Sequence, residues 1–314
     1  MPRGNRARRE RPGPSGFVVV DKPSGMTSHD VVDAVRRALG TRRVGHLGTL
    51  DPLATGVLPV AVRDATKLVP FVGSDPKVYV GSIELGVATD TFDAEGRVVQ
   101  RFDGPLPEEG AVRAALAAFV GEILQVPPMY SSVKHEGEPL HRIARRGGHV
   151  ERAPRKVRIH GIEMRAYRPP LVDVEVVCGA GTYVRSLAED LGRELGCGAH
   201  LANLRRTRSG PFLAERAVAL AALEAAAERG EAEALVIPPA EVLGLPVVAL
   251  DAAQLRRVSH GGDVTAPPAP GPPPAPGARV AAVDGNGTLV ALLEVRADRR
   301  LYPLRVLLSV APQG

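Results

Sequence analysis

The chain contains, near its start, the stretch Gly45-His46-Leu47-Gly48-Thr49-Leu50-Asp51-Pro52-Leu53-Ala54-Thr55-Gly56-Val57-Leu58-Pro59. Its glycines permit turns and a close approach of the backbone to a ligand. Pro52 biases Asp51 away from helical angles, toward an extended conformation. A carboxylate presented on such a loop is a common form of catalytic group. The alternative is an Asp that only caps a turn, as Asp often does.

The flanking residues predict the elements that hold this loop. Residues 16–25 have the pattern of a buried strand that ends in a turn. Thr27 or Ser28 can cap a helix over 28–39, which Gly40 ends. The apolar residues 57–62 follow the loop. Asp51 is therefore expected between a helix and an apolar segment.

Alternation and helical spacing predict further elements downstream. Beyond residue 245 the composition shifts, and a flexible Pro-, Ala- and Gly-rich loop is predicted over 266–277. An Asp- and Gly-rich stretch at 88–96 is expected to be a hairpin turn, since its spacing is not that of a calcium loop. Periodicity alone indicates an α+β fold. The predicted strands span 77–86, 156–164, 171–178, 279–283 and 288–294, and the predicted helices span 107–120, 214–229 and 251–258, with a further helix after Tyr183.

Composition narrows the class of protein. The 314 residues, 44% hydrophobic, predict one large domain with a smaller one, or two domains. Of the net charge of +5, residues 1–12 carry +4, so the rest is nearly neutral and bulk charge is weak evidence for nucleic-acid binding. Cys178 and Cys197 form no C-x-x-C pair, and we expect a reduced cytoplasmic compartment, without a metal site or a membrane span.

Several motifs recur in order and together resemble the TruB family of tRNA pseudouridine synthases. The stretch at 45–56 matches that family's G-H-x-G-x-L-D-P-x-A-x-G, and the resemblance covers roughly residues 16–210. Two small departures are Ser132 for alanine and Val184 for isoleucine. The other motifs are D-K-P-x-G-M-x-S at 21–28, Q-x-P-P-x-Y-S-A-x-K at 125–134, G-T-Y-I-R-[ST] at 181–186 and L-G-x-G-A-x-x-x-x-L-R-R at 195–206.

The resemblance implies a role for each candidate site residue. Asp51 would be the catalytic nucleophile and Arg185 its ion-pair partner. The Asp51 carboxylate would also offset the cost of placing the Arg185 cation in the first turn of a helix. Tyr79 would stack on the target base and is a candidate proton acceptor from C5; for a strand tyrosine the alternative is packing. His46, Tyr183, Leu204, Lys22 and Arg205 are the expected substrate-binding residues. The alternative for Lys22 is a packing turn with an exposed lysine. Arg206 and Arg208 are also expected to reach RNA, and Asp90 to support the edge of the cleft.

The resemblance also implies domains. Residues 1–15 are expected to be a disordered basic tail, and 16–240 the catalytic domain with the pseudouridine synthase fold, a mixed, largely antiparallel curved sheet with flanking helices. Residues 127–155 would form a mobile "thumb" that contacts RNA, because 142–158 hold seven Lys or Arg and one Glu. Residues 245–312 weakly resemble a PUA-like RNA-binding module.

The implied reaction is isomerisation of uridine 55 in the T-loop of tRNA. It removes and adds no atoms, so no cofactor is expected. A stand-alone monomer that binds the tRNA T-arm, without an obligate protein partner, is the leading hypothesis. The alternatives are a guide-RNA-dependent synthase and a non-catalytic tRNA-binding or tRNA-folding protein. A glycoside hydrolase that uses Asp51 would need a second carboxylate, which the motifs lack.

Overall fold

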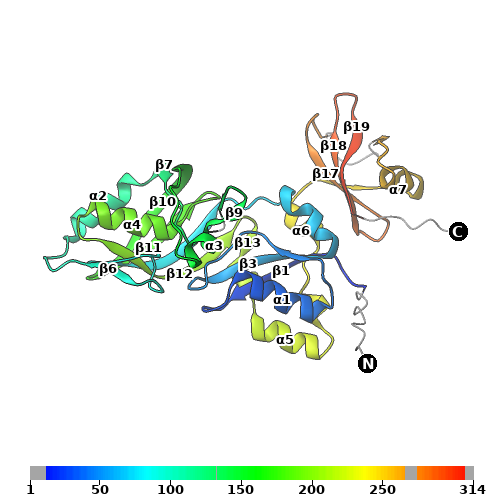
Figure 1. The fold of residues 1–314 in the computed structure, drawn as a ribbon. Coiled ribbons are helices and arrows are strands. Elements are labelled where there is room, and N and C mark those ends of the chain that lie inside the picture. Colours follow the sequence, from blue (N-terminus) through cyan, green and yellow to red (C-terminus); the bar gives the residue numbers. More distant parts are fainter. Residues whose placement is uncertain (1–11, 132, 266–273, 308–314) are drawn as a thin grey trace.

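The computed structural model describes residues 12–131, 133–265 and 274–307. Three parts of the predicted organisation lie outside the described residues: residues 1–11 of the tail expected over 1–15, residues 266–273 of the proline-rich loop expected over 266–277, and residues 308–312 of the C-terminal module. Figure 1 shows a large mixed sheet with helices and a smaller β-rich body formed by the C-terminal part of the chain. This agrees with the expected α+β class.

The main sheet has one long path of strands. Most neighbours are antiparallel, but β12 is parallel to β3 and β14 is parallel to β1. As a result β12 lies between β3, which follows the Asp51 loop, and β4, which carries Tyr79. The path is β14 (Val218–Ala219), β1 (Gly16–Lys22), β3 (Thr55–Val62), β12 (Ala199–Ser209), β4 (Lys77–Leu85), β11 (Leu171–Cys178), β10 (Arg155–Arg168) and β7 (Gly121–Gln125), with β2 (Val44–His46) paired to β3 and β13 (Phe212–Leu213) to β12.

Two pairs of helices cover different halves of this sheet (Figure 1). One pair is α1 (Ser28–Leu39) with α5 (Leu220–Glu228), and the other is α2 (Glu109–Ala118) with α4 (Val184–Glu194). Helix α1 has the predicted bounds: the side chains of Thr27 and Asp30 form a capping box, and Gly40 ends the helix in the left-handed conformation.

The predicted helix over 214–229 is wrong in its first third. Residues 214–219 instead form a 3₁₀ turn, η2 (Ala214–Arg216), and the strand β14, and α5 begins only at Leu220. Val218 pairs with Val20 of β1, so a tertiary strand contact overrides the local helix preference of the alanine-rich sequence.

Short elements project from the main sheet. The hairpin of β5 (Val87–Thr89) and β6 (Val98–Arg101) lies where a turn over 88–96 was predicted. Within the expected thumb, β8 (Lys134–His135) and β9 (Glu138–Pro139) pair ahead of α3 (Leu140–Arg145). The remaining short helices are η1 (Arg63–Phe71), η3 (Ala232–Leu235) and α6 (Pro239–Leu243).

The smaller body is a five-stranded sheet with one helix. Its strand order is β15-β17-β18-β19-β16, and the predicted helix and two predicted strands are present as α7, β17 and β18. Its face packs on the main domain, because Ala281 and Leu292 share a buried cluster with Phe17 and Val19 of β1. The bounds are β15 (Val247–Ala249), α7 (Ala252–Ser259), β16 (Val264–Thr265), β17 (Arg279–Val283), β18 (Leu289–Val295) and β19 (Arg300–Val306).

Among the described residues, no helix combines the length and the apolar character needed to cross a membrane.

Candidate active site

The loop between β2 and β3 is held in shape by hydrogen bonds along its length. The Ser28 hydroxyl accepts from the Leu50 amide (2.8 Å) and donates to the Leu50 carbonyl (3.0 Å). The Pro52 carbonyl accepts from the Gly25 amide at 2.9 Å. The residues before and after Asp51 are therefore tied to the turn and the first residue of α1. These hydrogen bonds fix the direction in which the Asp51 side chain points away from the loop.

The buried side chain of Arg206, on β12, supports the same loop from the protein interior. Its side chain is fully buried, and its guanidinium donates to the carbonyls of Val57 (2.8 Å), Gly48 (3.1 Å) and Thr49 (3.4 Å). The backbones meet here: a Cβ on Gly56, whose φ is +96°, would lie 2.2 Å from the Arg206 carbonyl oxygen. The prediction that Arg206 reaches RNA is therefore wrong.

Lys22 is a second buried cation beneath the loop. Its side chain is fully buried, and Nζ donates to the carbonyls of Pro23 (2.8 Å) and Pro52 (3.1 Å). Burial lowers the pKa of Lys22 to about 8, although the nearby charge of Asp51 opposes the shift. In this structure the Lys22 ammonium holds the residue that follows Asp51, and contact of Lys22 with substrate stays a prediction.

Asp51 is bound by the guanidinium of Arg185 in a two-point pair. Arg185 Nε lies 2.9 Å from Asp51 Oδ2, and Nη2 lies 2.9 Å from Oδ1. Arg185 is 3% exposed, whereas the Asp51 side chain is 33% exposed. The guanidinium also donates to the carbonyls of Tyr130 (2.8 Å) and Thr91 (3.2 Å). These carboxylate and carbonyl oxygens fix the Arg185 guanidinium in place, whereas the Asp51 carboxylate stays partly accessible.

A further carboxylate belongs to this cluster, but it is not the one that the sequence suggested. Asp93 Oδ2 lies 3.5 Å from Arg185 Nη1 and is buried. Asp90 instead bonds the backbone and side chain of Arg97 within the turn. Asp90 therefore stabilises the turn, and Asp93 is the supporting carboxylate. The two stand three residues apart in one acidic stretch, so spacing could not choose between them.

Asp51 opens into a cavity of about 290 Å³. The cavity brings together four of the residues selected from the sequence, while Arg185 stands behind Asp51 as its ion-pair partner. Two polar residues that the sequence did not single out, Lys77 and Ser131, also contribute to the wall. The lining residues are Gly48, Thr49, Leu50, Asp51, Ala54, Lys77, Tyr79, Ser131, Gly181, Thr182, Tyr183, Val184 and Leu204.

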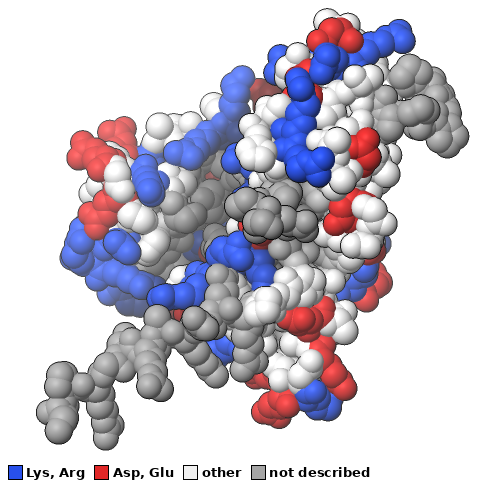
Figure 2. Space-filling view, turned by 90° about the vertical axis from the view of Figure 1, so that its right-hand side faces the viewer, with Lys and Arg blue, Asp and Glu red and all other residues white. Residues whose placement is uncertain are grey.

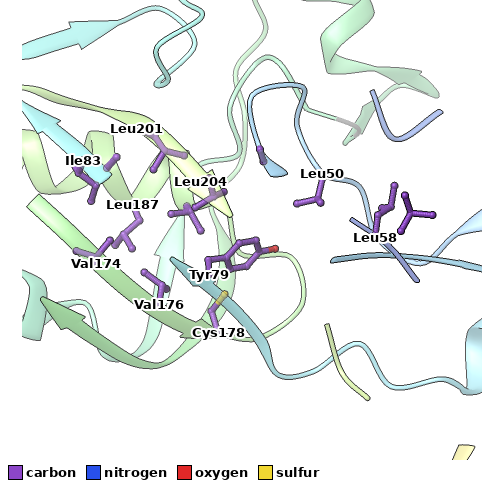
Figure 3. Close-up of a cluster of buried hydrophobic side chains, with 14 of the residues drawn as sticks. Leu50, Leu58, Tyr79, Ile83, Val174, Val176, Cys178, Leu187, Leu201 and Leu204 are labelled. Carbon is purple, nitrogen blue, oxygen red and sulfur yellow. The ribbon is translucent and has the colours of Figure 1, made fainter. Parts of the chain in front are cut away.

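Tyr79 packs into the core by one edge of its ring and borders the cavity. Figure 3 shows the ring among Leu204, Val176 and Cys178, with its hydroxyl directed toward the side of Leu50. Tyr79 is 6% exposed, and burial raises its pKa. Burial also raises the pKa of the Tyr183 phenol on the facing wall. Both phenols are therefore protonated at neutral pH.

Besides Lys22, two more of the predicted substrate-binding residues, His46 and Arg205, lie outside the cavity lining. His46 ends β2 opposite Val60. Its Nδ1 is buried and has no hydrogen-bond partner among the residues that the structure describes, and burial lowers the pKa of His46. Arg205 lies on the opposite face of β12 from Arg206 and pairs with both Asp21 oxygens at 2.9 Å. Arg205 borders two open grooves of about 600 and 510 Å³. Contact of either residue with substrate stays a prediction.

Among the described residues, no group of three or more His, Cys, Asp or Glu side chains is arranged to hold a metal ion. On the face shown in Figure 2, Lys and Arg side chains gather on both sides of a central hollow, and Asp and Glu lie mostly toward the margins.

Family models and individual relatives both match this chain to the same family. Residues 36–184 match the family model described as "TruB family pseudouridylate synthase (N terminal domain)", and residues 185–243 match "tRNA pseudouridylate synthase B C-terminal domain". A protein named tRNA pseudouridine synthase B from Dehalococcoides mccartyi (strain 195) is 41% identical over 95% of this chain and 98% of its own length. One with the same name from Stutzerimonas stutzeri is 42% identical over 96% and 98%.

A solved structure is also similar. It is titled as a Cbf5-Nop10-Gar1 complex, has a TM-score of 0.67 and 28% identity, and the match covers 93% of this chain and 85% of that one.

Proposed function

The chain belongs to the TruB family of pseudouridylate synthases, and we propose that it isomerises uridine 55 in the T-loop of tRNA to pseudouridine, with Asp51 as the nucleophile. The names and near full-length coverage of its relatives support tRNA as the substrate. One observation carries the assignment of Asp51. It is the carboxylate that Arg185 grips at both oxygens and that still opens into a cavity lined by Tyr79 and Leu204.

The reaction breaks the C1′–N1 bond, turns the uracil and joins its C5 to C1′. Asp51 attacks either C6 of the base or C1′ of the sugar, and it is released when the new bond is complete. The hydrogen on C5 is lost as a proton, and N1, freed from the sugar, takes up a proton, so the product is an isomer of uridine. The target nucleotide must leave the RNA stack to reach Asp51, and the cavity of about 290 Å³ gives the extruded base a place.

Tyr79 provides the aromatic wall on which the base stacks. Burial keeps its phenol protonated at neutral pH. Its hydroxyl therefore takes up the C5 proton only if it passes its own proton on to another acceptor. Tyr183 and Leu204 line the same cavity from the other elements.

The rest of the RNA is bound by basic surfaces outside the cavity. The thumb at 127–155 presents exposed cations such as Arg145 and Lys134, and its α3 follows the pair β8–β9. The small body over 245–312 acts as the PUA-like module. Phosphate contacts of this kind position the RNA without reading its sequence. We place the enzyme in the cytoplasm as a monomer.

The test is conversion of an unmodified tRNA transcript by the wild type and by Asp51→Asn, without guide RNA. Release of tritium from uridine labelled at C5 measures the reaction, and filter binding measures the RNA affinity. We expect conversion at one T-loop uridine, and in the variant no conversion but RNA affinity within about threefold of wild type. An active Asp51→Asn would remove Asp51 from the mechanism.

A guide-RNA-dependent synthase is the second candidate, because a solved complex containing Cbf5 resembles this chain over most of its length. Tight tRNA binding without conversion by the wild type would favour it over the stand-alone enzyme. If the wild type binds tRNA tightly but does not convert it even after guide RNA is added, a non-catalytic tRNA-binding protein would be favoured.

A further inference from the structure

Lys77 is a cation of the cavity wall. In the described part of the chain its side chain makes no hydrogen bond or ion pair, whereas the Lys22 side chain is bound to two carbonyls and that of Arg185 to Asp51. Burial, and next the charge of Arg206, lower the pKa of Lys77. The neighbouring Cys178 and Asp75 oppose the shift only in part. A half-buried ammonium that no carboxylate of the described residues pairs with is suited to an anion that arrives with a ligand.

The place of Lys77 on its strand relates it to the base. It stands two residues before Tyr79 on β4, so the two side chains leave the same face of the strand, about 7 Å apart. A spacing of this size matches one nucleotide, in which the sugar separates the base from its phosphate. Both residues line the one cavity.

The Lys77 ammonium lies beside Gly48 of the Asp51 loop. Lys77 Nζ lies 3.5 Å from the position that a Cβ on Gly48 would take, and Arg206 Nη1 lies 3.9 Å from the same position. Asp51 does not need Lys77 as a counter-ion, because Arg185 already engages both of its oxygens. Positive charge therefore gathers at the Gly48 side of the cavity.

We propose that Lys77 binds a phosphate flanking the target uridine once that nucleotide is extruded into the cavity. The inference rests on the proposed function, since it takes the ligand to be RNA with its base on Tyr79. Lysine recognises phosphate as a compact point charge with several donors. Lys77 is thus a positioning residue: it sets the depth at which the nucleotide enters and does no chemistry on the base.

The experiment is a binding cycle with Lys77→Met and modified RNA. The RNA is a T-arm stem-loop, either unmodified or with one uncharged methylphosphonate on the 5′ or the 3′ side of the target uridine. We expect the modification at one of these sites to weaken binding to the wild type about tenfold, and to change the affinity of Lys77→Met less than twofold. For unmodified RNA, Lys77→Met should also reduce the slope of log affinity against log salt by about 0.7.

Controls separate this role from a structural one. Arg113→Met removes an exposed, paired cation from α2 and should show the wild-type sensitivity to methylphosphonate. Lys77→Arg should keep most of the coupling, and unchanged thermal midpoints would show that the variants are folded. Equal methylphosphonate effects in the wild type and in Lys77→Met, at both sites, would overturn the proposal. Binding is measured apart from conversion, so an inactive wild type would contradict the proposed function without deciding the role of Lys77.

Discussion

Arg185→Met is expected to destabilise the protein far more than Asp51→Asn, although the two residues form one pair. Removing the guanidinium leaves Asp51 and the buried Asp93 without their shared cation, and leaves the carbonyls of Thr91 and Tyr130 without a donor. Breaking a buried pair from one side costs about 3–5 kcal/mol. Because Asp51 is one-third exposed, we expect a loss of about 2–4 kcal/mol in the free energy of unfolding.

Asp51→Asn should cost only about 1 kcal/mol. The amide oxygen still accepts one guanidinium bond, and Arg185 keeps Asp93 and both carbonyls as partners. Urea unfolding followed by circular dichroism gives the free energies. In the double variant, the cost of Arg185→Met should fall by about 1–2 kcal/mol, because no charge remains on residue 51 to be stranded.

Arg113→Met serves as the matched control, because Arg113 pairs with Glu109 at the surface, and it should stay within about 0.5 kcal/mol of wild type. If the cost of Arg185→Met is the same in the wild-type and Asp51→Asn backgrounds, the charge pair is not what makes Arg185 necessary. That result would refute the assignment of Arg185 as the counter-ion of Asp51.

Three other substitutions or reactions test the site. Tyr79→Phe should keep RNA affinity within about threefold while the single-turnover rate falls, whereas Tyr79→Leu should also lose roughly 1–3 kcal/mol of stacking; equal binding by both variants would argue against a stacked base. Between pH 8 and 10.5 the unfolded chain holds a proton on Lys22 that the folded chain has released, so the stability of wild type relative to Lys22→Met should rise over this window by about 3 kcal/mol; a constant difference in urea unfolding would contradict the lowered pKa. Burial raises the pKa of Cys178 to about 11, so its thiol should react with a disulfide reagent at pH 8 only as fast as the protein opens; rapid labelling of the native protein would show that Cys178 is exposed.

The sequence was informative where the signal is local. The capping residues and the glycine of α1 predicted both of its ends, because these contacts lie within a few residues of one another. The strand over 171–178 was likewise predicted with its bounds from its alternation, whereas β10 extends beyond the predicted 156–164 to Arg168. Tyr79, Asp51 and Arg185 were chosen through family motifs, and their roles stay predictions until they are measured.

The basic residues misled where a side chain's surroundings come from distant parts of the chain. Arg205 and Arg206 are adjacent in a run of cations, but β12 sends them to opposite faces. Arg206 meets the carbonyls of the Asp51 loop only because β12 pairs with β3 across some 150 residues of sequence. Lys22 is buried for a similar reason, through Pro52. The spacing of residues along the sequence does not predict which distant carbonyl a lysine will bind.

The position of β12 also has a consequence for how the protein folds. This strand separates β3 from β4, and it is made more than a hundred residues after either of them. Until residues 199–209 leave the ribosome, β4 and the first two residues of β3 lack the neighbour that β12 provides, and open edges invite pairing with other chains. Contacts that join such distant residues close slowly, since a long loop must be ordered before they form. Arg206, which supports the Asp51 loop, is therefore added only late in synthesis. A nascent chain halted before β12 would contain Arg185, which binds Asp51, but would lack the side chain that holds the loop in place.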